Sequence, residues 1–219
     1  KDSSGGVPNN LKPPVQKYLA KKYDNLLSGG LVGISDAQLK AHFGLYEKYV
    51  TNINDIEAKL KIIDPNNPDA LSYRGLHVEQ SFNLNGVILH EFYFGNLGGS
   101  SKEPKGLLKK MIERDYGNPL NFLNHLKGVG KVMRGWSMAA LNYRTGRIGI
   151  YGLDQHNQLV STLVFPILVL DVYEHAYMID FGTDRKKYLE IFANNINWKI
   201  VQDRLELALT MPYGEHITA

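Results

Sequence analysis

The sequence predicts an α+β protein: an all-α N-terminal helical hairpin, then a C-terminal α/β domain with a small three-stranded antiparallel sheet. Apolar residues recur at helical spacing through the first half of the chain, and strand-like stretches appear only in the second half. A glycine- and serine-rich stretch, 97–106, separates the two halves as a linker. We therefore expect a flexible leader over 1–14, a hairpin domain over 15–96 and an α+β domain over 107–219.

The N-terminal half is expected to form helices. Apolar positions at helical spacing predict a first helix over 15–27. Ser35 is suited to cap a long second helix over 36–60. After a polar turn, a third helix over 70–94 is expected, with one interruption near 83–86, where Asn and Gly occur.

The C-terminal half is expected to combine helices with three strands. The predicted strands cover 136–143, 147–153 and 163–170. The predicted helices cover 107–116, 119–128, 172–180, 186–194 and 198–209. The segment Arg144–Gly146 is typical of a hairpin turn, so the first two strands should be antiparallel neighbours.

Composition excludes several classes of function. The net charge of +3 is too small to predict a nucleic-acid partner, and none is expected. The absence of cysteine excludes disulfides, zinc–thiolate sites and cysteine nucleophiles. The longest apolar run has about eight residues and contains Pro166, well short of the ~20 that a membrane span needs. The compartment stays open, because a polar leader fits both the cytoplasm and export after leader removal.

A carboxylate and an imidazole stand four residues apart at the end of the last predicted strand. Asp171 and His175 follow an apolar run and begin a predicted helix, where residues at this spacing share a face. Asp paired with neutral His is a ligand combination that iron and manganese accept. The pattern therefore indicates a candidate metal site, although a D-x-x-x-H spacing alone is weakly specific.

The full string over 171–177 is more specific, because it resembles the D-V-W-E-H-A-Y signature of the iron/manganese superoxide dismutases, with Tyr173 in place of Trp. The segment 41–54 resembles the first metal-binding helix of that family, and 85–94 resembles the second. The metal ligands that this resemblance implies are His42, His90, Asp171 and His175.

The resemblance implies an oxidoreductase that disproportionates superoxide to dioxygen and hydrogen peroxide. One iron or manganese ion per subunit would cycle between its trivalent and divalent states, and the sequence leaves open which metal is used. A homodimer is expected, and a tetramer remains open. Two alternatives stand beside this reading. One is a different mononuclear non-haem iron redox enzyme, although four protein ligands leave few open positions. The other is a non-catalytic metal-binding relative.

The resemblance also implies roles for residues beside the ligands. Tyr49 matches the tyrosine of the first ligand helix, and Trp136 matches a tryptophan that walls the pocket. Glu174 matches a glutamate that bridges to the partner subunit's His175, and Tyr177 matches an interface tyrosine beside the substrate funnel.

One further group should donate a hydrogen bond to solvent beside the metal and so adjust its redox potential. The family has an N-terminal source for this group, but the matching position here is Gly86, which has no side-chain donor. The donor should then be His156 or Gln155. We favour His156, because its spacing from Asp171 resembles that of family members that use histidine.

Overall fold

The computed structural model describes residues 17–99 and 102–211, so the expected leader over 1–14 lies outside the described residues. The helices are α1 (Asp36–Leu60), α2 (Ala70–Gly95), α3 (Gly106–Tyr116), α4 (Pro119–Val132), α5 (Met178–Phe181), α6 (Arg185–Asn194) and α7 (Trp198–Thr210). The strands are β1 (Trp136–Asn142), β2 (Arg147–Leu153) and β3 (Val164–Asp171). Two 3-10 turns complete the order, η1 (Asp24–Leu26) and η2 (Glu174–Ala176). The predicted α+β class is confirmed.

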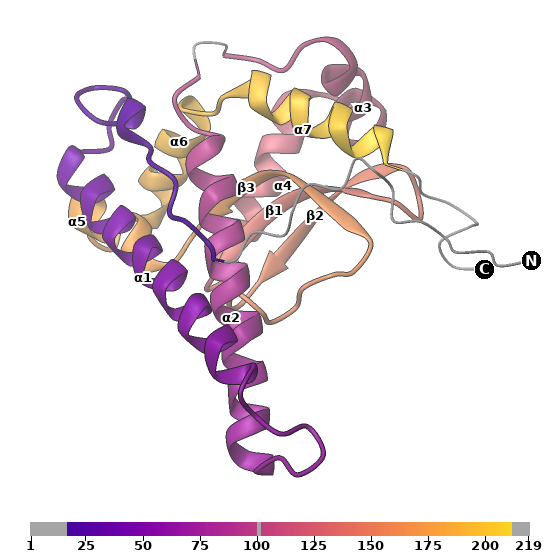
Figure 1. Ribbon diagram of the computed structural model, residues 1–219. Helices are drawn as coiled ribbons and strands as arrows, with labels where there is room; N and C mark the ends of the chain where they lie inside the picture. The colour runs from indigo at the N-terminus through magenta and orange to yellow at the C-terminus, as the bar shows by residue number, and fades with distance from the viewer. Residues whose placement is uncertain (1–16, 100–101, 212–219) are drawn as a thin grey trace, which may run out of the picture.

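Helices α1 and α2 form the expected hairpin, which projects from the body of the molecule (Figure 1). Ser35 caps α1, since its side chain accepts a hydrogen bond from the backbone N–H of Gln38. The interruption predicted near 83–86 is wrong, because α2 is continuous. The side-chain amide of Asn83 donates to the backbone carbonyl of Glu79, one helical turn earlier. This polar side chain is therefore accommodated without an interruption of α2.

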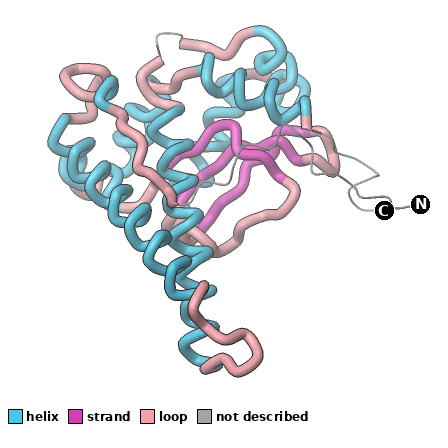
Figure 2. The backbone as a smooth tube through the Cα atoms, in the orientation of Figure 1, coloured by secondary structure: helices cyan, strands magenta, loops and turns pink. Residues whose placement is uncertain are grey.

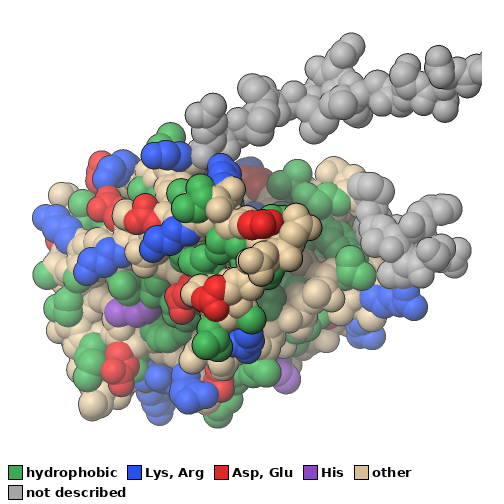
Figure 3. Space-filling model, turned by 60° about the horizontal axis from the view of Figure 1, so that its bottom comes forward, with side chains coloured by type: hydrophobic (Ala, Val, Ile, Leu, Met, Phe, Trp, Pro, Cys, Tyr) green, Lys and Arg blue, Asp and Glu red, His purple; other side chains and the backbone are tan. Residues whose placement is uncertain are grey.

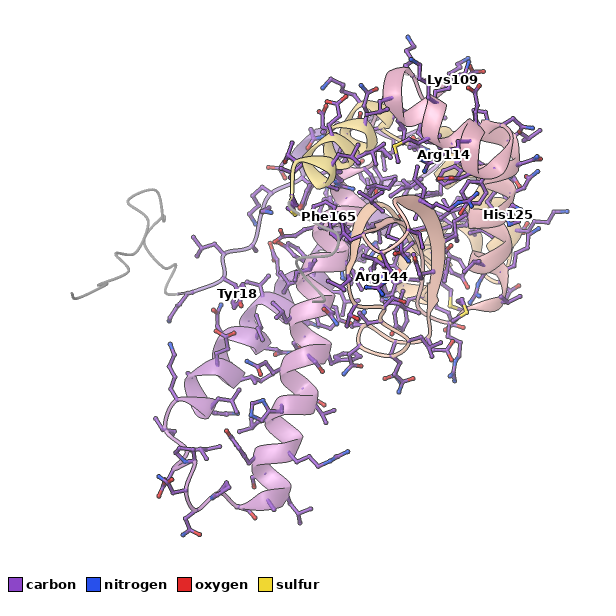
Figure 4. All side chains as sticks on the ribbon, turned by 90° about the vertical axis from the view of Figure 1, so that its right-hand side faces the viewer. Tyr18, Lys109, Arg114, His125, Arg144 and Phe165 are labelled. Carbon is purple, nitrogen blue, oxygen red and sulfur yellow. The ribbon has the colours of Figure 1, made fainter. Side chains whose placement is uncertain are left out.

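The segment before α1 is not the helix that was predicted over 15–27. Of its described residues, only η1 has helical hydrogen bonding. The backbone N–H and C=O of Tyr18 both bond to the side chain of Asn54, at 2.9 and 3.0 Å, and Tyr18 lies beside the hairpin in Figure 4. The backbone N–H of Lys21 donates to the hydroxyl of Tyr46. Contacts with α1 therefore replace the hydrogen bonds of a helix here.

The sheet, drawn in magenta in Figure 2, has the order β2-β1-β3. Both pairs of strands are antiparallel. The register places Trp136 opposite Leu153 on one side and opposite Asp171 on the other. Helices α2, α4 and α7 pack against the sheet. The central strand β1 therefore carries Trp136 into the interior, next to the end of β3.

A single cluster of buried apolar side chains runs from the N-terminal helices through the sheet to α7. An isolated bridge also joins Leu97 to Ile196, at the start of the expected linker. The division into separate domains stays a prediction, because the core is continuous across it.

The surface carries charges of both signs. On the face shown in Figure 3, lysine and arginine side chains are interspersed with aspartate and glutamate. Within the described part of the chain, no helix is both long enough and apolar enough to cross a membrane.

Candidate metal centre

Four side chains from separate elements converge at the base of the hairpin. His42 lies on α1, His90 on α2, Asp171 at the end of β3 and His175 in η2. One potential ligand atom from each lies within 4.8 Å of the others. The Oδ2 atom of Asp171 lies 3.1, 3.5 and 3.2 Å from the Nε2 atoms of His42, His90 and His175. The structure thus brings together the residues that the resemblance named as ligands.

The route by which Asp171 and His175 meet differs from the predicted one. The expected helix over 172–180 is replaced by η2 and the short helix α5. Asp171 ends a strand, where the backbone N–H of Val172 still donates to the carbonyl of Gly135. The two side chains therefore do not share a helical face. The turn after the strand folds His175 back toward the carboxylate.

The hydrogen bonds of His90 and Asp171 determine which of their atoms face the centre of the cluster. His90 donates from Nδ1 to the carbonyl of Gly86 at 2.6 Å, which leaves a lone pair on Nε2. This Nε2 is buried and has no hydrogen-bond partner among the described residues. The backbone N–H of Tyr173 donates to Oδ1 of Asp171, so Oδ2 faces the imidazoles. Oδ2 is within hydrogen-bond distance of Nε2 of His42 and of His175, so among these atoms the unpaired acceptor is Nε2 of His90.

The electrostatics of the cluster also suit a metal ion. Burial lowers the pKa of His42, and burial lowers the pKa of His90 well below its ordinary value, so both rings stay neutral. Burial acts to raise the pKa of Asp171, but the adjacent His175 and His42 outweigh it and lower that pKa. Neutral imidazoles around an ionised carboxylate fit an iron or manganese ion.

His156 and Trp136 form the wall of this cluster. Trp136 donates from Nε1 to Nδ1 of His156 at 3.0 Å. His156 must then carry its proton on Nε2, which is buried without a partner among the described residues. Burial lowers the pKa of His156 to about 4, so this ring is neutral at pH 7. The site therefore holds a buried N–H donor that has no acceptor in the part of the chain that the structure describes.

Tyr49 lies against the same wall. Its ring centroid lies 4.8 Å from that of His156 and 5.3 Å from that of His90. Burial raises the pKa of Tyr49, so its hydroxyl stays protonated at neutral pH. Gly86 makes room for this packing: a Cβ there would lie 3.0 Å from Tyr49 Cγ and 3.3 Å from His156 Cδ2. A side chain at position 86 would therefore displace both rings.

The remaining predicted site residues lie at the margin of the cluster. Gln155 and Glu174 are exposed. Tyr177 is buried; its hydroxyl accepts from Nε of Arg185 at 3.1 Å, and its ring stacks on Tyr188 at 5.0 Å. The structure thus places His156 in the cluster and leaves Gln155 outside it.

Two residues beside the ligands were not assigned roles from the sequence. The ring of Tyr173 stacks on His175 at 5.0 Å and 14°, and it also lies 5.0 Å from His156. Gln38 is buried, with its side chain bonded to the backbone around His175. For Gln38, the available signal was a polar residue one helical turn before His42.

Other histidines lie away from the cluster. His77 bonds to Gln80 near the tip of the hairpin, at an exposed position. His125 is on α4, and Figure 4 shows it on the side of the molecule away from the hairpin. Neither contributes to the group of potential ligands.

Fold and site together are those of a protein that could hold one metal ion on three imidazoles and one carboxylate. Residues 104–204 match the family described as iron/manganese superoxide dismutases, C-terminal domain. An iron superoxide dismutase of Aquifex aeolicus is 41% identical over 195 residues, which is 85% of this chain and 91% of that protein.

Two further relatives are similar over much of the chain. An iron superoxide dismutase of Methanothermobacter marburgensis is 34% identical, covering 79% of this chain and 88% of that protein. A manganese/iron superoxide dismutase of Aeropyrum pernix is 33% identical over 144 residues, which is 64% of this chain and 67% of that protein. The chain belongs to the iron/manganese superoxide dismutase family.

Proposed function

We propose that this protein disproportionates superoxide to dioxygen and hydrogen peroxide. The observation that carries the proposal is the convergence of His42, His90, Asp171 and His175 on one buried point. These residues would hold a single iron or manganese ion. When bound, that ion supplies a one-electron couple that lies between the oxidation and the reduction of superoxide.

The side chains around the ligands would prepare the site for a small anion. His156 offers its buried Nε2–H to a water molecule or an anion beside the ligands. Tyr49 keeps its hydroxyl proton at neutral pH, so it can donate a hydrogen bond to superoxide or to peroxide. Trp136 is fully buried and closes the inner side of the pocket against bulk water. Among the ligand side chains, His175 is the one that reaches solvent, with 25% of its side chain exposed.

The proposed assembly is a homodimer, with a tetramer as the larger alternative. Glu174 is exposed next to the ligand His175, and its neighbours Met178 and Ile179 expose apolar surface. In the proposed dimer, Glu174 accepts a hydrogen bond from the partner subunit's His175, and symmetry repeats this contact. Sedimentation of the wild type and of Glu174→Ala tests the arrangement. A wild-type monomer at working concentration would overturn it.

The test of the activity is superoxide consumption by protein loaded separately with iron and with manganese, with the metal content measured. Activity with one metal identifies the cofactor, and activity with both shows that either ion serves. Stoichiometric metal without activity in either form would overturn the proposal.

The role of His156 has its own test. His156→Ala should keep its metal but shift the midpoint potential and lower the rate, since loss of such a partner costs about 10–100-fold. Gln155→Ala is the matched control and should leave both unchanged. The opposite pattern would transfer the role to Gln155.

A further inference from the structure

Three side chains tie the start of α1 to the turn that carries His175. Gln38 donates from Nε2 to the carbonyl of His175 at 2.6 Å, and its Oε1 accepts from the backbone N–H of Ile179 at 3.0 Å. Ser35 donates from its backbone N–H and its hydroxyl to the carboxylate of Asp180, at 2.7 and 2.6 Å. We call Ser35, Gln38 and Asp180 the α1 latch.

The latch joins two of the four ligands through their backbones. Gln38 lies one turn before His42 on α1, and the carbonyl it bonds belongs to His175 itself. Figure 1 shows α5 beside the start of α1, and contacts between α1 and both η2 and α5 agree with this view. The spacing between His42 and His175 therefore depends on these bonds.

The turn that the latch holds is the weakest element of the site. Its regular structure amounts to the 3-10 turn η2 and the short helix α5, whereas His42 and His90 lie within long helices. Asp171 is held by strand pairing with β1. Short elements with few internal hydrogen bonds open most readily, and the latch supplies bonds that η2 and α5 lack internally.

Burial shows where an ion could enter or leave. In a single subunit, His42, His90 and Asp171 expose at most 1% of their side chains, whereas His175 exposes 25%. An ion would therefore pass His175, on the side that Glu174 of the partner subunit covers in the proposed dimer, and it could do so when the turn moves away from α1. We propose that the α1 latch is the gate for metal exchange: Gln38 and Asp180 are positioning residues that set the rate at which metal leaves the site. This inference rests on the proposed metal site and not on the substrate.

Substitution of each latch residue provides the test. The protein is loaded with cobalt(II), which reports its ligand geometry optically, and the rate of metal loss to excess chelator is measured. Gln38→Leu removes both amide contacts at similar volume, and Asp180→Asn removes the charge that accepts from Ser35. Each should speed metal release by about tenfold, the equivalent of one typical net hydrogen bond, with the cobalt spectrum unchanged.

The matched control is Asp36→Asn. Asp36 stands at the same helix end, but its carboxylate accepts from the backbone N–H of Ser28, outside the latch. This variant should release metal at the wild-type rate. Gln38→Met, which removes the same two contacts with an unbranched side chain of similar length, should release metal as fast as Gln38→Leu, and it replaces Gln38→Leu if that variant does not fold.

Hydrogen exchange separates a gate from a general loss of stability. In Gln38→Leu, the amide of Ile179 should lose protection, while amides in the middle of α2 and β1 keep theirs. Wild-type release rates in both latch variants, or equal acceleration in Asp36→Asn, would overturn the inference. A wild type that binds metal but consumes no superoxide would overturn the proposed activity and leave the latch result standing.

Discussion

The position of one proton on each buried imidazole decides what that residue can do. His90 gives its Nδ1 proton to Gly86 and so presents a lone pair, whereas His156 accepts from Trp136 and so presents a proton. The two rings lie 5.7 Å apart. Neighbouring histidines are thus set for opposite tasks, one to bind a cation and the other to donate a hydrogen bond.

Removal of a ligand should abolish metal binding. Asp171→Ala deletes the carboxylate that all three imidazoles face. We expect a loss of affinity beyond the ~10–100-fold that an outer partner contributes, and no superoxide-dependent activity. Metal analysis after dialysis checks this. His125→Ala, an off-site histidine on α4, should retain its metal. Full metal occupancy in Asp171→Ala would contradict the ligand assignment.

The buried imidazoles should make the metal-free protein sensitive to acid. The pKa of His156 falls from 6.5 to about 4 in the folded state. Between these values the unfolded chain binds the proton and the folded chain does not, so lowering the pH through this window favours unfolding. The contribution is about 1.4 kcal/mol per pH unit, and His42 and His90 act in the same direction. Denaturant midpoints at pH 7 and pH 4.5 should differ, and His156→Asn should reduce the difference. Equal midpoints in the wild type would refute this.

At the scale of elements, the two glycines in the interior of α2 look equivalent in the sequence but differ in the structure. A Cβ at Gly86 would press on Tyr49 and His156, whereas a Cβ at Gly75 would meet nothing within 4 Å. Gly75→Ala should therefore stabilise the protein by about 0.5–1 kcal/mol through helix propensity.

Gly86→Ala should instead destabilise the protein by about 1–3 kcal/mol, because it overpacks the site. It should also disturb the environment of His156, which NMR of the imidazole would detect. Unfolding free energies of the two variants give the comparison. Similar stabilisation by both substitutions would show that Gly86 is not packed as described.

Most elements were predictable because local patterns determine them. The two long helices and the three strands lie within about two residues of their predicted bounds. The two helices that were predicted wrongly are explained by hydrogen bonds to residues distant in the sequence. The helical spacing over 15–27 was overridden by bonds to Asn54 and Tyr46, and the predicted helix over 172–180 gave way to a turn bonded to Gln38.

The site was predictable only in part, for a similar reason. Seven histidines occur in the sequence, and local pattern does not separate the ligands His42 and His90 from His77 or His125. The resemblance to a known family supplied that separation. The local pattern offers only a polar residue one turn before His42. The bonds of Gln38 to the turn at His175 depend on a partner 137 residues away in the chain, which local pattern does not indicate.

At the scale of the whole molecule, the proposed metal site would link the two halves of the chain. Two of its proposed ligands come from the hairpin and two from the end of β3 and η2. An ion held at a thousand times its dissociation constant would add about 4 kcal/mol to the unfolding free energy. Calorimetry should therefore place the metal-loaded form on the order of 10 °C above the metal-free form. If the metal-loaded and metal-free forms unfolded at the same temperature, bound metal would not stabilise the contact between the two halves.

The proposed metal site is tested most directly by anomalous diffraction at the iron edge from crystals of the iron-loaded protein. We expect one ion per chain, bound by Nε2 of His42, His90 and His175 and by Oδ2 of Asp171, with the Nε2 of His156 directed at a water molecule beside it. An ion at another position, or a water held by Gln155 in place of His156, would contradict the proposed site.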